Sequence, residues 1–224
     1  MSNFTTWRSL VDGEEIAGIP DSEVYYPVDE GSGQTFNDYF GDVNATTEDS
    51  ITWISDSDFA GGFYADFGEA RVQLDSLLPF IGTDQDWSLA FTMIRDSTSS
   101  SSNVVWQGQE WVSTIESGEI TFARWDGNEF VNRSSIDRPS HPFTARVLYR
   151  YNNSSGDSEI FLDASEGAGS ERPNDSNTVA EDELIAIGGE SIRDQRYAEI
   201  GVDAIRFDDS LIDPQDDFEK QLWS

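Results

Sequence analysis

The stretch FTARVLYRY, residues 143–151, decides the fold class. Every second position holds an apolar or aromatic residue: Phe143, Ala145, Val147, Tyr149 and Tyr151. Because successive side chains of a β-strand point to opposite faces, this period of two predicts a strand with one apolar face. The β-branched and aromatic residues in the stretch favour the same conformation.

Similar short runs follow one another along the chain, separated by Gly, Asn, Asp and Ser residues that favour turns. About a dozen short strands at this spacing predict an all-β protein, a two-sheet antiparallel β-sandwich, rather than an open sheet covered by helices. The other predicted strands are SITWIS (50–55), GGFYADFG (61–68), ARVQLDSL (70–77), DWSLAFTMIR (86–95), NVVWQGQEWV (103–112), GEITFARW (118–125), NEFVNRSS (128–135), SEIFLDAS (158–165), LIAIGG (184–189) and AEIGVDAIRFDD (198–209).

The two ends of the chain depart from this pattern. Residues 1–22 contain glycines and a proline but no regular period, so we interpret them as a lead-in that docks on a neighbouring protein. A single domain is predicted over residues 23–224. Near its end, Asp213 fits an N-cap and Pro214 fits the first helical position, which predicts a short C-terminal helix over residues 213–222.

Acidic residues give the strongest compositional signal. The chain has 44 Asp and Glu against 13 Lys and Arg, a net charge of −31. In molar salt the Debye length falls to about 3 Å and the repulsion is screened, so the composition indicates a halophilic protein. A disordered acidic tail is the alternative, but the acidic residues are interleaved with aromatic and aliphatic ones. The same charge argues against a nucleic-acid partner.

Cysteine usage and hydropathy exclude further classes of site and segment. The chain has no cysteine, so it has neither disulfides nor thiolate metal sites. Its apolar runs are too short for a membrane-spanning helix, and we expect no membrane insertion. The first ten residues, MSNFTTWRSL, lack the apolar core of a signal peptide.

Several short motifs occur in a characteristic order: DEGSG at 29–33, NDYFGDVN at 37–44, IGG at 187–189 and VDAIRF at 202–207. In this order they resemble the laminin-G-like, concanavalin A-like jelly-roll family. Each piece alone is common, and the ordered set over residues 23–223 carries the resemblance. It implies that the sandwich is a jelly roll.

This resemblance also implies a structural Ca²⁺ at the rim of the sandwich, bound by oxygen atoms of the opening loop and the closing strand. Two alternatives stay open. Acidic clusters arise by chance in so acidic a chain, and Arg206 is able to neutralise the closing-strand aspartate without a metal. The residues that match the calcium site are Asp29, Asp38, Asp42, Asn44 and Asp203.

Asp203 is the most informative of these residues because its neighbours in the strand are apolar. Strict alternation over residues 202–207 places its carboxylate on the same face as Ile205 and Phe207, and Arg206 on the opposite face. A carboxylate on an apolar face needs compensation. A metal is therefore favoured over Arg206 as its partner.

Glycan binding is a second implication of the resemblance, because exposed aromatic rings stack on sugars while amides and carboxylates bind the hydroxyls. Trp106 and Trp111 differ in parity within the run 103–112, so at least one of them is expected in the core. We favour the core for two of the three tryptophans concerned. The candidate residues are Trp106, Gln109, Trp111 and Trp125.

The sequence gives no support for catalysis. Retaining glycanases of this fold carry a Glu-x-Asp-x-(x)-Glu strand whose carboxyl groups lie about 5 Å apart, and that spacing does not occur here. Glu159 and Asp163 flank apolar residues instead. The only histidine, His141, precedes a proline at the start of a strand and is interpreted as a packing residue. We predict that the chain is not an enzyme, with a glycan hydrolase as the least favoured alternative.

One functional hypothesis joins these observations. A lectin-like sandwich without a visible export signal suits a virion protein assembled in the host cytoplasm, and the domain resembles those of virion proteins in haloarchaeal tailed viruses. We expect a structural or adhesion protein (capsid decoration, turret or tail component), a homo-oligomer that contacts other virion proteins and host surface glycans. The competing hypothesis is a cellular carbohydrate-binding module of a haloarchaeon, extracellular or on the cell surface.

Overall fold

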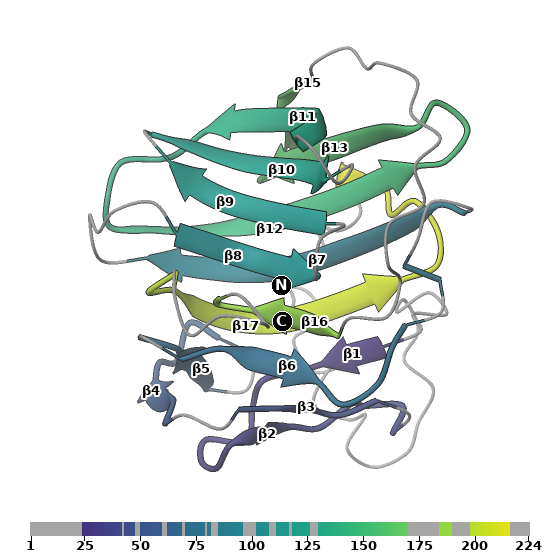
Figure 1. Ribbon diagram of the computed structural model, residues 1–224. Coiled ribbons are helices and arrows are strands. Elements are labelled where there is room, and N and C mark those ends of the chain that lie inside the picture. The colour runs from purple at the N-terminus through teal and green to yellow at the C-terminus, as the bar shows by residue number, and fades with distance from the viewer. Residues whose placement is uncertain are drawn as a thin grey trace.

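The structure, a computed structural model, describes the chain in segments separated by gaps. Within them the chain forms two antiparallel sheets that pack face to face (Figure 1). The predicted two-sheet β-sandwich is confirmed, whereas the predicted lead-in of residues 1–22 lies outside the described residues. These are residues 24–41, 43–47, 50–59, 62–68, 70–78, 80–81, 85–95, 102–107, 111–116, 118–125, 130–169, 184–189 and 198–215.

One sheet, which we call the β7 sheet, has eight strands among the described residues. Its order is β14-β13-β12-β7-β17-β5-β4, and β1 pairs with β17 as well. The strands are β1 (Val24–Tyr26), β4 (Thr52–Ser55), β5 (Phe63–Asp66), β7 (Trp87–Arg95), β12 (Phe143–Asn152), β13 (Asp157–Leu162), β14 (Ser165–Glu166) and β17 (Gly201–Asp208).

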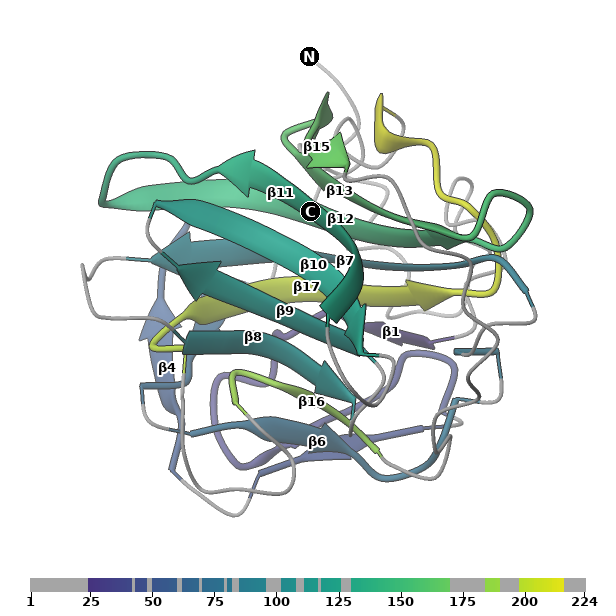
Figure 2. The same cartoon turned by 45° about the horizontal axis from the view of Figure 1, so that its top comes forward.

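The second sheet, the β9 sheet, has nine strands in the described ranges, in the order β15-β11-β10-β9-β8-β16-β6-β3-β2. Figure 2 shows β8 to β11 lying across the β7 sheet. The strands are β2 (Thr35–Phe36), β3 (Ala45–Thr46), β6 (Val72–Leu74), β8 (Ser102–Gln107), β9 (Trp111–Glu116), β10 (Glu119–Trp125), β11 (Phe130–Asp137), β15 (Ala168–Gly169) and β16 (Ile185–Ile187).

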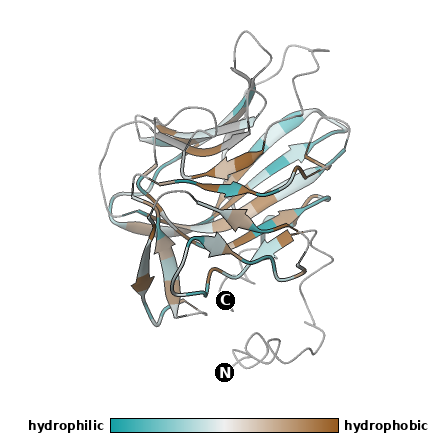
Figure 3. Ribbon diagram, turned by 60° about the horizontal axis from the view of Figure 1, so that its bottom comes forward, coloured by the Kyte–Doolittle hydropathy of each residue, from teal (hydrophilic) through white to brown (hydrophobic). Residues whose placement is uncertain are grey.

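Strand β12 confirms the alternation read from residues 143–151. It pairs with β7 on one side and with β13 on the other. Its apolar residues at odd positions all belong to the core between the sheets, while Arg146, Leu148 and Arg150 lie on the opposite face. Hydrophobic and hydrophilic residues alternate along the strands in the same way in Figure 3.

Aromatic rings fill one half of the core. The Trp111 ring lies 4.9 Å from the rings of Trp87 and Tyr151 and 5.6 Å from that of Phe122, measured between centroids. Side chains of this size bury 150–250 Å² each. They are the main source of hydrophobic stabilisation at this end of the sandwich.

The run NVVWQGQEWV is two strands, not the single strand predicted from the sequence. Gln107 at the end of β8 pairs with Trp111 at the start of β9, so the chain reverses between them. Glycine is a residue type that favours turns, and the sequence has one directly after Gln107. The parity argument for Trp106 and Trp111 therefore fails, because parity holds only within one continuous strand.

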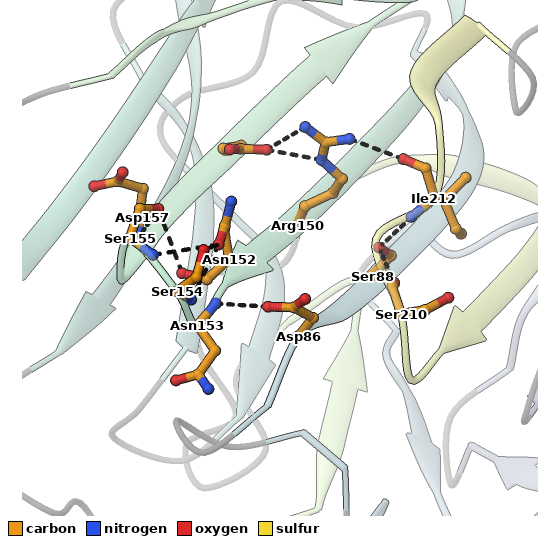
Figure 4. A network of polar contacts seen from close by, with 11 residues as sticks. Asp86, Ser88, Arg150, Asn152, Asn153, Ser154, Ser155, Asp157, Ser210 and Ile212 are labelled. Atoms are coloured by element: carbon orange, nitrogen blue, oxygen red, sulfur yellow. Dashed lines mark hydrogen bonds and ion pairs between the residues drawn. The ribbon is translucent and has the colours of Figure 1, made fainter.

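The outer face of the β7 sheet is crossed by the segment that follows β17 (Figure 4). The hydroxyl of Ser88 donates to the carbonyl of Ser210 at 2.6 Å and accepts from the amide of Ile212 at 3.0 Å. Arg150 Nη1 donates to the Ile212 carbonyl at 3.0 Å. The Ile212 side chain packs in a small apolar cluster with Ala90, Leu148 and Phe161. This segment thus shields the middle of the outer face from water.

The predicted C-terminal helix begins where the sequence places it. Helical backbone starts at Pro214, and the amide of Gln215 donates to Asp213 Oδ1 at 2.9 Å. Asp213 is therefore the N-cap, as predicted. Residues 216–224 lie outside the described residues. No helix in the described ranges is long and apolar enough to cross a membrane.

Candidate functional site

The DEGSG loop leaves β1 and turns back toward β5. Gly31 has φ of +64°, and a Cβ at this position would lie 3.1 Å from the Phe63 ring. Glycine is thus needed for both the backbone conformation and the close contact. Asp29 at the start of the loop is exposed.

Glu30 is the half-buried carboxylate of this loop and was not singled out from the sequence. Its Oε1 accepts hydrogen bonds from the backbone amide of Asn37 at 2.7 Å and from Asn37 Nδ2 at 3.2 Å. Its Oε2 is buried and has no hydrogen-bond partner. Burial raises the pKa of Glu30, and the amide of Asn37 opposes that rise.

Asp38 organises the second part of the opening segment. Its Oδ1 accepts from the amides of Tyr25, at 2.9 Å, and Phe40, at 3.3 Å, and its Oδ2 accepts from the amide of Val43 at 3.2 Å. Asn44 Oδ1 accepts from the amide of Asp38 at 3.1 Å. Asp38 therefore ties the loop to β1 through the Tyr25 amide, and Asn44 ties two parts of the loop together.

This tied loop presents two aromatic side chains to solvent. Tyr39 is 40% exposed and Phe40 is 43% exposed. Their ring centroids lie 5.3 Å apart at 89°, and the Tyr39 ring contacts that of Tyr25 edge-on at 6.5 Å. The amide of Tyr39 donates to the Tyr25 carbonyl at 2.7 Å. We call residues Asp38–Gly41 the aromatic turn.

Asp203 lies on the outer face of the β7 sheet, and the prediction that it shares a face with Ile205 and Phe207 is wrong. The register against β7 shifts between Asp203 and Arg206, and Ala204 has φ of +49°. This β-bulge adds one residue and reverses the alternation after it. Arg206, predicted on the opposite face, therefore lies on the same face as Asp203.

Buried arginines surround the bulge. Arg146 Nη1 donates to the carbonyl of Ala204 at 2.7 Å, and Arg206 Nη2 is hydrogen-bonded to the carboxylate of Asp208. Burial raises the pKa of Asp203 to about 8, while the charge of Arg146 and the amide of Ala204 oppose the rise. Only 2% of Asp203 is exposed. Burial therefore favours the protonated form of this carboxyl group.

Three of the predicted calcium ligands, Asp38, Asn44 and Asp203, interact with other groups of the protein. The described residues contain no group of three or more acidic or histidine side chains able to hold a metal ion. The oxygens of Asp38 and Asn44 accept backbone amides, and Asp203 lies in the field of Arg146. Calcium needs six to eight oxygen ligands. Asp42 lies outside the described residues, and calcium binding stays a prediction.

The structure describes the side chain of only one of the three tryptophans predicted to bind sugars. Trp111 is 2% exposed and belongs to the core, so its prediction as a sugar-stacking residue is wrong. The side chains of Trp106 and Trp125, and the whole of Gln109, lie outside the described residues. The sequence reasoning missed Tyr39 and Phe40, although two adjacent aromatics in a turn between aspartate and glycine were a signal for them.

The carboxylate considered for catalysis is held in an ion pair. Glu159 Oε2 accepts from Arg150 Nε at 2.7 Å and from Arg150 Nη2, across neighbouring strands β13 and β12. Arg150 also covers the Phe161 ring at 4.5 Å. Glu159 therefore fixes Arg150 on the outer face of the β7 sheet.

No protein-family model matches the sequence, and no curated protein matches it. Solved structures match the fold. A structure of botulinum neurotoxin type C, whose cell entry depends on interaction with two ganglioside molecules, matches with a TM-score of 0.70 at 12% identity, over 92% of this chain and 53% of that chain. The binding domain of botulinum neurotoxin DC in complex with rat synaptotagmin II matches with a TM-score of 0.69 at 10% identity. The match covers 89% of this chain and 51% of that chain.

A binding domain of botulinum neurotoxin DC in complex with SialylT gives a TM-score of 0.64 at 10% identity, over 87% of this chain and 52% of that chain. The chain thus spans about half the length of the structures it matches. At these identities the likeness is one of fold, and it agrees with the jelly-roll form expected from the sequence.

Proposed function

We propose that the chain is a non-catalytic β-sandwich module that binds glycans at the aromatic turn. The observation that carries the proposal is the exposed pair of Tyr39 and Phe40 on a backbone held by the Asp38 carboxylate. The C–H face of a sugar ring packs on an aromatic ring. Rigid aromatic side chains also lose little conformational entropy on binding.

The size and charge of the site favour a neutral glycan over other partners. Two exposed rings offer far less than the roughly 800 Å² per partner buried in a standard protein interface, which favours a small ligand. The net charge of −31 repels phosphates and anionic lipid surfaces. A neutral sugar binds without this electrostatic penalty.

The likeness of fold adds support of a different kind. Two of the matching structures are binding domains of botulinum neurotoxin, and cell entry of the type C toxin is described as dependent on two ganglioside molecules. A sandwich of this architecture thus occurs in proteins that attach to cell surfaces. The non-catalytic part of the proposal is supported by Glu159, whose carboxylate is bonded to Arg150.

Substitution at the aromatic turn tests the proposal. Wild-type protein in about 2 M KCl should bind one or more neutral oligosaccharides on a glycan array. Tyr39→Ala and Phe40→Ala should each weaken that binding about two- to tenfold, since an aromatic contact contributes about 0.5–1.5 kcal/mol. Titration calorimetry with the best glycan gives the affinities.

Leu77→Ala is the matched control, because Leu77 is also a large exposed hydrophobic residue, at 45%. It should bind glycan as the wild type does. Equal losses in all three variants, or unchanged binding in both aromatic variants, would show that the aromatic turn is not the site.

We propose a virion of a halophilic virus as the setting of the module, where it acts as a structural or adhesion protein. The acidic composition and the family resemblance support this setting. Mass spectrometry of purified virions from a hypersaline host should detect the chain at structural copy number. Its absence from virions, with recovery in the cell-surface fraction, would favour the cellular carbohydrate-binding module instead.

A further inference from the structure

The edges of the two sheets differ in how they are protected. An edge strand presents unpaired backbone N–H and C=O groups to other strands, and folded proteins keep such edges short, charged or covered. In the described part of the chain, β14, β15 and β2 end their sheets with two residues each. The free edge of β1 is covered, because the amide of Tyr25 donates to Asp38 and its carbonyl accepts from the amide of Tyr39. These edges offer little to a further strand.

Strand β4 is the exception among the described edges. It has four residues, pairs only with β5 within the described ranges, and lies at the margin of the molecule in Figure 1 and Figure 2. Thr52 and Ser55 at its two ends are exposed, and Trp53 and Ile54 between them are half-buried. The strand is therefore accessible to a partner strand.

The side chains of β4 are held in place on both faces of the sheet. Trp53 packs against the core, and its Nε1 donates to the Gly33 carbonyl at 3.1 Å. Ile54 therefore points to the outer face, opposite Tyr64 of β5. The Tyr64 ring in turn contacts that of Phe59, with 5.2 Å between the centroids. Half-buried apolar groups thus border the open edge.

Charge decides which partner suits this edge. The run SITWIS, residues 50–55, carries no charged side chain, although Asp49 and Asp56 flank it and the chain has a net charge of −31. A basic partner would be attracted to carboxylates, which the run lacks. A second copy of the chain is repelled by carboxylates and approaches most readily at an uncharged surface. The edge therefore fits a second copy better than a basic protein.

We propose that β4 pairs with β4 of a second copy, antiparallel and about a two-fold axis, so that the two β7 sheets become one continuous sheet. Such a contact is isologous and closes on itself, which gives a dimer rather than a fibre. With the axis at Trp53 or Ile54, Asp56 lies opposite Ser50 or Thr52 instead of another carboxylate. β-branched, aromatic and hydroxyl side chains form favourable cross-strand pairs. The proposal does not depend on glycan binding.

The size of the contact sets the expected affinity. One four-residue strand and the neighbouring rings of Phe59 and Tyr64 offer less than the roughly 800 Å² per partner of a standard interface. We therefore expect a reversible dimer with a Kd on the order of 10 μM in about 2 M KCl, where the charge repulsion is screened. The mean mass in solution should rise with protein concentration.

Sedimentation equilibrium over a range of protein concentrations tests the dimer. Wild type should approach twice the mass of the chain. Ser55→Glu should raise the dimer Kd about tenfold, because it places a carboxylate on both strands of the symmetric contact. Thr144→Glu is the matched control, since Thr144 is also exposed but lies on β12 in the interior of the same sheet, and it should dimerise as the wild type does. Wild-type protein that stays monomeric at about 0.5 mM would overturn the proposal.

A single engineered cysteine locates the contact. Because the chain has no cysteine of its own, Ile54→Cys introduces the only thiol. Cβ atoms of directly opposite or diagonal residues in paired strands lie about 5–8 Å apart, which a short bis-maleimide spans. Ile54→Cys should therefore be crosslinked to a dimer, and Thr144→Cys should not, with circular dichroism showing that each variant is folded. A dimer that persists in Ser55→Glu and is not crosslinked in Ile54→Cys would place the interface elsewhere.

Discussion

In buffer of about 0.1 M KCl we expect the chain to melt at least on the order of 10 °C below its Tm in about 2 M KCl. The net charge of −31 leaves most carboxylates without a cationic partner. Between these salt concentrations the Debye length grows from less than about 3 Å to about 10 Å, so carboxylates on neighbouring strands begin to repel one another. Circular dichroism over a KCl series measures the effect.

A neutral osmolyte separates charge screening from general stabilisation. Sucrose strengthens apolar burial because it is excluded from protein surfaces, but it does not screen charge. Sucrose added at 0.1 M KCl should therefore recover only a small part of the lost stability. A Tm that stays constant across the KCl series would contradict the halophilic interpretation, and full recovery in sucrose would show that repulsion is not the cause.

The parts of the fold with strict alternation could be predicted from the sequence. Residues 143–151 form all of β12 except its last residue and have the predicted face inward, because a slip by one residue would expose the entire apolar set. The Asp213 N-cap was equally clear, since its signal needs only adjacent residues. Strands with strong local periodicity and helix N-caps can be predicted without tertiary information.

Departures from regular strand pairing could not be predicted from the sequence. Ala204 adopts φ of +49° at the bulge of β17, although alanine gives no sequence signal for positive φ. The conformation is held by Arg146, a residue 58 positions away along the chain. A regular strand therefore places Asp203 on the wrong face, whereas Arg206 lies opposite to Phe207 as expected. A bulge that is fixed by a distant side chain is a tertiary effect, so the periodicity of the strand sequence cannot predict it.

Calcium binding at the opening loop stays a prediction, and the structure shows a further role for two of the predicted ligands. The sequence predicts Asp38 and Asn44 as oxygen ligands, and in the structure their side-chain oxygens accept hydrogen bonds from backbone amides. Both roles require the same residue types in a turn, so composition does not distinguish them. Tyr39 and Phe40 lie between these residues and become a candidate site only when their exposure is known.

Asp203→Asn should stabilise the chain at alkaline pH. Burial raises the pKa of Asp203 to about 8, whereas its unfolded value is near 3.8. Between these two values the folded state binds a proton that the unfolded state has lost, so the contribution of Asp203 to stability is full below pH 3.8 and falls as the pH rises toward 8. Asparagine carries no charge at any pH. The variant should therefore exceed the wild type at pH 8–9 by on the order of a few kcal/mol, since each pKa unit corresponds to about 1.4 kcal/mol.

Asp208→Asn is the control, because Asp208 is equally buried on the same strand and the same face but its carboxylate is bonded to Arg206 and Ser210. Its replacement leaves the buried Arg206 without its charged partner and should destabilise the chain by about 3–5 kcal/mol. Urea unfolding in about 2 M KCl at pH 5 to 9 gives the free energy of unfolding as a function of pH for the wild type and the two variants. Because the variants share every other titrating group, the difference from wild type isolates one carboxyl. Parallel curves for wild type and Asp203→Asn would mean that the Asp203 carboxyl is ionised in the fold, with Arg146 compensating its charge after all.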